Sequence, residues 1–233
     1  MIILAVDSSG PVVSAAVSKE DKILYEAAAN CGLTHSETMQ PMIEQVVRGA
    51  GISPGEVDLF ACVTGPGSFT GVRIGVCAVK AMAQALDRPC VALNALEVLA
   101  AGKYGFIGTI CPILDARREQ VYAAAYSFSE GEVPRIVLEE DALPLLRYLE
   151  KIPEGRLLFV GDGVPVHKEK IRGILGERAL FSPDCTGQLR CGVACYLAAR
   201  KPTCDAMALA PLYLRRPQAE REREARLHGG KNV

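Results

Sequence analysis

The chain has 233 residues, of which 49% are hydrophobic and 23% are charged, and its formal net charge is −1. This much apolar surface can be buried, which excludes disorder over most of the length, and the length suits one large domain or two small ones. Proteins that bind nucleic acid through phosphates usually carry a basic excess, and here it is confined to residues 215–233, with six Lys and Arg against three Glu.

Three short strands joined by tight turns are expected at the start of the chain. The apolar runs cover residues 2–7, 12–18 and 23–29. The connections between them are too short for a crossover, so neighbouring strands should be antiparallel. Further buried strands are expected at residues 58–64 and 90–94.

Two unusually apolar helices should flank the strand at residues 58–64. Thr34 and Glu37 form a capping box at the start of the first helix, and Gly49 and Gly51 stop it. Its apolar side chains recur at helical spacing and make one stripe. The second helix runs from about residue 70 to residue 86, and its polar side chains share one narrow face: Arg73, Lys80 and Gln84.

The second half of the chain repeats this theme. Strands are expected at residues 106–115, 120–128 and 157–160, helices at 95–104, 142–151 and 187–200, and an extended segment at 209–214. We therefore predict an α/β fold built from a duplicated unit, with one subdomain at 1–103 and a smaller one at 104–214. The composition of residues 215–233 predicts a mobile charged tail.

The glycine-rich loop at residues 65–71 follows a strand and leads into a helix, where backbone N–H groups can bind phosphate. It lacks the Gly-Lys-Ser/Thr of a Walker loop, and its glycine spacing differs from the Rossmann pattern. The alternative is structural, because glycines let two backbones pack closely. We favour this structural interpretation.

The two apolar helices also suggest a contact between chains. We predict that they lie side by side and present one apolar surface to a partner, and that a second copy of the chain competes for this surface. Some of their side chains must face the chain's own sheet, and the sequence does not sort them. The predicted interface residues are Met39, Met42, Ile43, Val46, Val47, Gly71, Val72, Gly75, Val76, Val79 and Ala83.

Catalytic and metal-ligating candidates are scarce. No two of the three histidines lie at i, i+4, and His167 sits in a charged stretch that indicates a surface position. Asp7 ends the first strand, where actin-like ATPases hold a metal and nucleotide, although a turn-forming carboxylate is the plainer interpretation. We therefore predict no catalytic residue and no metal site.

The cysteines and the apolar segments point to a cytoplasmic protein. The nine cysteines form no Cys-x-x-Cys pair, so reduced and mostly buried thiols are expected. The opening residues lack the charged start of a secretory signal, and no stretch is long and apolar enough for a membrane span.

Five segments together resemble the TsaB (YeaZ) family: residues 3–9, 34–47, 65–75, 112–118 and 211–215. The string at 65–75, Gly-Pro-Gly-Ser-Phe-Thr-Gly-Val-Arg-Ile-Gly, is highly specific, and the resemblance covers nearly all of residues 1–215. It implies the fold of the actin/Hsp70/sugar-kinase superfamily, which is ribonuclease H-like, and a bacterial protein whose relatives also carry the label M22 glycoprotease.

The resemblance also implies a role. TsaB proteins are partners of the paralogous enzyme TsaD and, with the small ATPase TsaE, serve the transfer of a threonylcarbamoyl group to the adenosine beside the anticodon of ANN-decoding tRNAs. TsaD holds its catalytic metal with a His-x-x-x-His pair, and the matching positions here are Ala95 and Leu99. The resemblance thus implies a non-catalytic subunit without metal or cofactor, which meets tRNA only through the complex and is a homodimer in isolation.

An enzyme of the same fold is the alternative, either an M22-type metallopeptidase or an ATPase. It would need a metal or a competent phosphate site, and the two replaced positions argue against the metal. Remnants of phosphate loops nevertheless define a candidate vestigial nucleotide site: Asp7, Ser8, Gly65, Gly67, Gly161 and Asp162.

Overall fold

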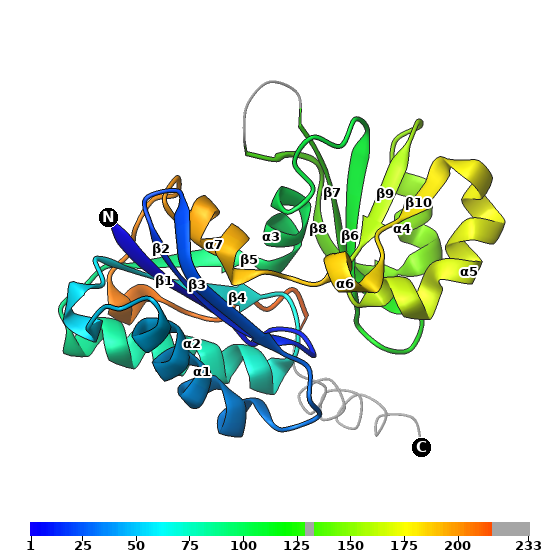
Figure 1. Ribbon diagram of the computed structural model, residues 1–233. Helices are drawn as coiled ribbons and strands as arrows, with labels where there is room; N and C mark the ends of the chain where they lie inside the picture. Colours follow the sequence, from blue (N-terminus) through cyan, green and yellow to red (C-terminus); the bar gives the residue numbers. More distant parts are fainter. Residues whose placement is uncertain (129–132, 216–233) are drawn as a thin grey trace, which may run out of the picture.

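A computed structural model describes residues 1–128 and 133–215, and it contains two mixed five-stranded sheets (Figure 1). The first sheet has the strand order β3-β2-β1-β4-β5. Its first three strands are antiparallel neighbours, as predicted, whereas β4 lies parallel to β1 and β5 parallel to β4. The strands are β1 (Ile2–Asp7), β2 (Val13–Lys19), β3 (Lys22–Ala29), β4 (Leu59–Gly65) and β5 (Cys90–Asn94).

The second sheet repeats this arrangement. Its order is β10-β9-β6-β7-β8. The strand β6, which comes first along the chain, has the antiparallel pair β7 and β8 on one side and the parallel strands β9 and β10 on the other. The strands are β6 (Thr109–Asp115), β7 (Gln120–Ser127), β8 (Arg135–Pro144), β9 (Leu157–Val160) and β10 (Ala179–Phe181). The two sheets share one topology, so the predicted α/β fold built from a duplicated unit is confirmed.

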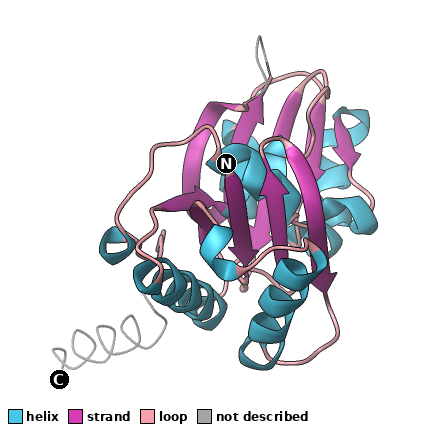
Figure 2. Ribbon diagram, turned by 60° about the vertical axis from the view of Figure 1, so that its left-hand side comes forward, coloured by secondary structure: helices cyan, strands magenta, loops and turns pink. Residues whose placement is uncertain are grey.

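Helices and sheets alternate in layers (Figure 1, Figure 2). The outer face of the first sheet is covered by α1 (His35–Gly49) and α2 (Phe69–Ala85). The sheet and these two helices form the first lobe. The second sheet, α4 (Leu145–Lys151) and α5 (Gly163–Leu175) form the second lobe. Between the sheets lie α3 (Ala95–Ala101) and α7 (Cys191–Ala198), whose side chains join a core shared by both sheets.

After β10 the chain passes through α6 (Asp184–Gly187) and returns to the first lobe. There α7 packs on β1 and β2, where small buried residues such as Ala5 and Ala16 leave room for a helix. Glu26 of β3 fixes the start of α7, because its Oε1 accepts hydrogen bonds from Arg190 Nε and from Gly192 N, each 3.0 Å long. Residues from about 190 onward, which the predicted boundary assigns to the subdomain at 104–214, thus pack on the first sheet.

The first-lobe helices match their prediction, and the Thr34–Glu37 capping box is present. Several elements beyond β7 were not predicted: the mostly exposed strand β8, the helix α5, the short strand β10 and the short helix α6. The described residues also contain short 3-10 turns at Pro54–Glu56, Gly176–Arg178 and Ala206–Ala208, and the last of these directly precedes the segment that was predicted to be extended.

The predicted tail lies outside the described residues except for Arg215. No helix in the described part of the chain is long and apolar enough to cross a bilayer.

Candidate functional site

The glycine-rich loop before α2 packs directly against the turn that follows β1. A Cβ atom on Gly67 would lie 2.2 Å from Ser9 O, and one on Gly71 would lie 2.0 Å from Ser8 O. Ser68 N donates a hydrogen bond to Ser9 O over 2.7 Å, and Ser8 Oγ donates to Gly71 O over 2.8 Å. Any side chain at these glycines would overlap a backbone oxygen, which confirms the structural interpretation of the loop.

The first residue of α1 holds the same turn from another side. His35 Nε2 donates a hydrogen bond to Gly10 O over 2.8 Å. The imidazole also lies close to α2, because a Cβ atom on Gly71 would be 3.0 Å from its Cδ2. The turn after β1 is thus held by the beginnings of both helices that were predicted to meet a partner.

Beyond this turn a narrow crevice separates the two lobes. Its lining includes Asp7 at the end of β1, Ala95 and Leu99 of α3, and Asp162 before α5, and it encloses about 20 Å³. Burial removes both carboxyls from water and raises the pKa of Asp7 and of Asp162 to about 6. Each keeps one backbone partner, since Ser9 N donates to Asp7 Oδ1 over 2.8 Å and the backbone N of residue 115 donates to Asp162 Oδ1 over 3.0 Å.

The residues predicted as a vestigial nucleotide site divide into two groups. Asp7, Gly161 and Asp162 meet in the crevice. Ser8, Gly65 and Gly67 instead pack within the first lobe, where a Cβ atom on Gly65 would lie 2.7 Å from Leu212 O. A volume of about 20 Å³ holds roughly one water, whereas small-molecule sites usually span about 300–1,000 Å³. The crevice in this arrangement therefore does not fit a nucleotide.

The two positions that the family resemblance matches to the metal ligands of TsaD face this crevice. Ala95 and Leu99 are buried, and their alkyl groups have no electron pair to give to a metal. Glu97, between them in sequence, pairs with Lys201. Within residues 1–128 and 133–215, no group of three or more His, Cys, Asp and Glu side chains is placed to hold a metal ion.

The residues predicted to form the partner surface lie on the faces of α1 and α2 that cover the first sheet. All eleven are buried in the free chain, and the nine that are not glycine belong to one apolar core with side chains of the first sheet. The physical reason is the period of the stripe, because the most regular apolar face of a helix is the one that covers its own sheet. In the free chain these residues therefore face the first sheet and do not form an exposed surface.

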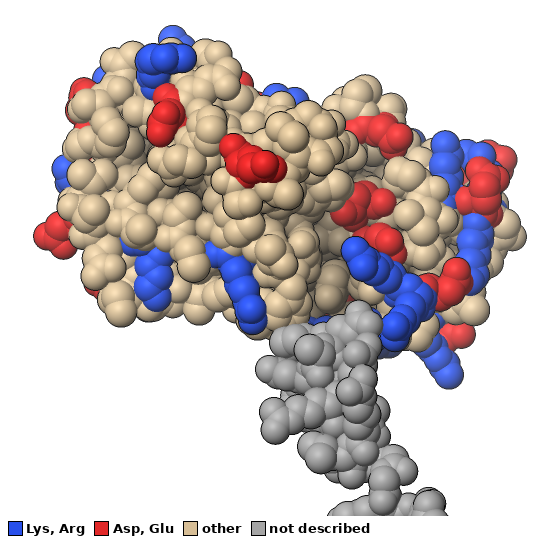
Figure 3. Space-filling model, turned by 90° about the horizontal axis from the view of Figure 1, so that it is seen from below, with Lys and Arg blue, Asp and Glu red and all other residues tan. Residues whose placement is uncertain are grey.

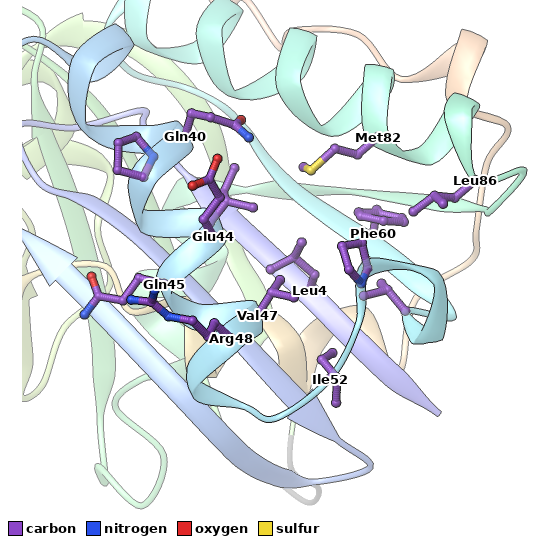
Figure 4. A pocket seen from close by; sticks show the side chains of 14 residues that line it. Leu4, Gln40, Glu44, Gln45, Val47, Arg48, Ile52, Phe60, Met82 and Leu86 are labelled. Carbon is purple, nitrogen blue, oxygen red and sulfur yellow. The ribbon is translucent and has the colours of Figure 1, made fainter.

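The outer face of α2 is nevertheless apolar too. Cys77 and Ala81 are exposed, and Ile74, Ala78 and Met82 are partly exposed. Between α1 and α2 a groove of about 800 Å³ opens. Figure 4 shows Val47, Phe60, Met82 and Leu86 along its walls, with Gln40 and Glu44 on the α1 side.

A family model described as "TsaD: tRNA N6-adenosine threonylcarbamoyltransferase" matches residues 29–222. The chain is 33% identical to "tRNA threonylcarbamoyladenosine biosynthesis protein TsaB" of Bacillus subtilis, over 94% of this chain and 96% of that one. The chain belongs to the TsaB (YeaZ) family, which is related to TsaD. The protein of the same name from Escherichia coli is 27% identical over 92% of this chain and 95% of its own.

A solved structure agrees with this membership of the TsaB family. "YeaZ from Pseudomonas aeruginosa" superposes with a TM-score of 0.75 and 26% identity, covering 91% of this chain and 99% of that one.

Two features of this TsaB-family chain were not predicted from the sequence. Residues 205–214 run over the polar face of α2, where Arg73 Nε donates to Tyr213 OH over 2.8 Å and the Tyr213 ring stacks on Phe69 at 4.2 Å between centroids. The only indication of this segment in the sequence was that the three polar residues of α2 share one face of an otherwise apolar helix. His167, expected at the surface, is buried, with Nε2 lying 3.8 Å from Asp115 Oδ1. Its burial follows from α5, which was not predicted.

Proposed function

We propose that this chain is the non-catalytic partner subunit of TsaD in threonylcarbamoyl transfer to the adenosine beside the anticodon of ANN-decoding tRNAs. The ATPase TsaE completes the complex, and tRNA is bound by the complex rather than by this chain in isolation. The similarity to the threonylcarbamoyladenosine biosynthesis proteins TsaB of Bacillus subtilis and Escherichia coli supports a role in this pathway.

One observation carries the non-catalytic part of the proposal. Where TsaD is expected to hold a metal, this chain places the alkyl side chains of Ala95 and Leu99 in a crevice of about 20 Å³. Ser9 and Gln188 also line the crevice, together with two buried carboxyls whose pKa values are raised, and the volume leaves no room for a substrate or a nucleotide beside them. The residues available are therefore those of a scaffold.

The helix pair remains the proposed contact with TsaD, with its residues revised. We assign the contact to the outer face of α2 around Cys77, Ala78 and Ala81, together with the groove beside α1. Small side chains on this face allow close approach of a second helix, and the groove offers an apolar recess for its larger side chains. A TsaD chain of the same fold would present its own helix pair, and a second copy of this chain would compete for the same surface.

The function is tested by threonylcarbamoyl transfer to tRNA with purified TsaD and TsaE, with and without this chain. Transfer should require the chain, and the chain should copurify with TsaD. The proposal is wrong if TsaD and TsaE give full transfer without it, or if this chain in isolation hydrolyses peptides or ATP.

The revised contact is tested by Ala81→Glu. Position 81 is exposed, so the variant should fold, but a charge buried without a partner at the contact should weaken TsaD binding by about 3 kcal/mol, roughly a hundredfold in Kd. Leu146→Glu is the matched control, because it adds the same charge to an exposed helical position of the second lobe. Equal TsaD binding by both variants and the unmodified chain would place the contact elsewhere.

A further inference from the structure

The turn between β6 and β7 has an unusual backbone. Arg117, Arg118 and Glu119 have φ angles of 62°, 53° and 61°, three consecutive non-glycine residues in the left-handed region. Each such residue costs roughly 1–2 kcal/mol relative to a right-handed one. Strain of this kind persists where the surroundings enforce it, and it is concentrated at functional sites.

The surroundings do enforce this conformation. Arg117 N donates to Asp115 Oδ1 over 2.9 Å, and Gln120 N donates to Arg117 O over 3.1 Å. Glu119 is held twice, because its backbone O accepts from Leu145 N over 3.1 Å and its carboxylate pairs with Lys170. These contacts order the turn within the free chain.

The turn presents two arginines to solvent. Arg117 and Arg118 are exposed, and within the described part of the chain neither guanidinium has a hydrogen bond or an ion pair. The nearby acidic groups are engaged elsewhere: Glu119 with Lys170, and Asp115 Oδ1 with the N–H of Arg117.

The turn lies at the lower edge of the molecule in Figure 1. Figure 3 views this side and shows Lys and Arg side chains on the second lobe, with acidic ones among them.

We propose that the Arg117–Arg118 turn binds phosphates of the RNA backbone when the tRNA is held by the complex. This inference rests on the proposed function. Guanidinium groups match phosphate geometry with paired N–H donors, and a turn that is already ordered loses little conformational freedom on binding. The near-neutral chain as a whole does not attract nucleic acid, so the contact is local and depends on TsaD to bring the tRNA to it.

The test measures tRNA affinity of the complex of this chain with TsaD and TsaE over a series of KCl concentrations. Arg117→Gln with Arg118→Gln should weaken binding about tenfold at moderate salt and reduce the slope of log Kd against log salt by about 2. Arg147→Gln with Lys151→Gln is the matched control, since it removes two charges from exposed positions on α4 of the same lobe. The control should keep the affinity of the unmodified complex.

A second variant separates charge from folding. Arg117→Gly with Arg118→Gly relieves the backbone strain, so it should be at least as stable as the unmodified chain and should still lose tRNA affinity. Unchanged affinity in both turn variants, or an equal loss in the α4 control, overturns the proposal. If affinity for TsaE falls while tRNA affinity stays, the turn binds an acidic protein surface and the RNA assignment is wrong. Failure of the unmodified complex to modify tRNA would instead overturn the proposed function.

Discussion

At the scale of single residues, glycines 67 and 71 decide how the first lobe closes around the turn after β1. Their spacing was visible in the sequence, and a close backbone approach was the favoured interpretation. The partner in that approach was not visible, because Ser8 and Ser9 lie some sixty residues away along the chain. Long-range contacts of this kind follow from the order of the strands, which local patterns do not specify.

Gly71→Ala should therefore destabilise the fold. Its Cβ atom would lie 2.0 Å from Ser8 O, a backbone atom that cannot move aside cheaply, so we expect a loss of about 2–3 kcal/mol in the free energy of unfolding. Gly173→Ala in α5 is the control, because a Cβ atom there meets nothing within 4 Å and should stabilise the helix by about 0.5–1 kcal/mol. Urea unfolding of both variants measures the difference, and similar stabilities would disprove the close-packing argument.

The carboxyl of Asp7 should make stability depend on pH. Burial raises its pKa from 3.8 to about 6, so the folded state holds the proton more tightly than the unfolded state. The resulting stabilisation is fully present below about pH 4 and is lost as the pH rises through 6, which for a shift of about two units amounts to roughly 3 kcal/mol.

Asp7→Asn tests this, since the amide cannot ionise but keeps an oxygen for the hydrogen bond from Ser9 N. The variant should be more stable than the unmodified chain at about pH 8 and similar to it at about pH 4, by urea unfolding. A variant that is less stable at both values would show that the carboxylate is favourable where it lies.

At the scale of elements, the sequence predicted the first lobe better than the second. The capping box and regular apolar stripe of α1 and the buried runs of β1 and β4 are strong local signals. β8 is mostly exposed at a sheet edge and carries Glu139, Glu140 and Asp141, so no alternation of buried residues marks it. The helix α5 buries few side chains, and Pro165 and a run of charged residues interrupt its apolar pattern, so the sequence did not predict it.

Residues 205–214 are held on the first lobe by the burial of Leu209, by hydrogen bonds from Lys80 of α2 and by Tyr213, whose contribution can be isolated. Tyr213→Phe removes the hydrogen bond from Arg73 but keeps the stack on Phe69, so it should cost less than about 1 kcal/mol. Tyr213→Ala also removes the stack and should cost about 1–2 kcal/mol more. Urea unfolding of the two variants separates these contributions, and equal losses would mean that the stack contributes nothing.

At the scale of the whole molecule, the two sheets share one core. α3 and α7 lie between them, and side chains from both helices and both sheets form one apolar cluster. The sequence predicted the duplication but not this return of the chain, because α7 follows the second sheet in sequence and packs on the first in space. The predicted boundary at residue 103 separates the two sheets and leaves the first without α7.

Residues 1–103 expressed in isolation should therefore fail to fold cooperatively. Without α7, one face of β1 and β2 would be exposed to water together with the apolar side of α3, such as Leu96 and Val98. Exposed apolar area of this kind costs roughly 25 cal/mol for each Å², and fragments that expose it tend to associate. Circular dichroism during urea titration should show a broad or absent transition.

A matched chain in which residues 188–215 follow 1–103 through a flexible linker restores α7 and the segment over α2, so it should regain a cooperative transition. The full-length protein should unfold in one step that is the same by circular dichroism and by tyrosine fluorescence. A sharp transition in residues 1–103 without α7 would show that the first subdomain is independent, and two separate steps in the full chain would show that the shared core does not couple the lobes.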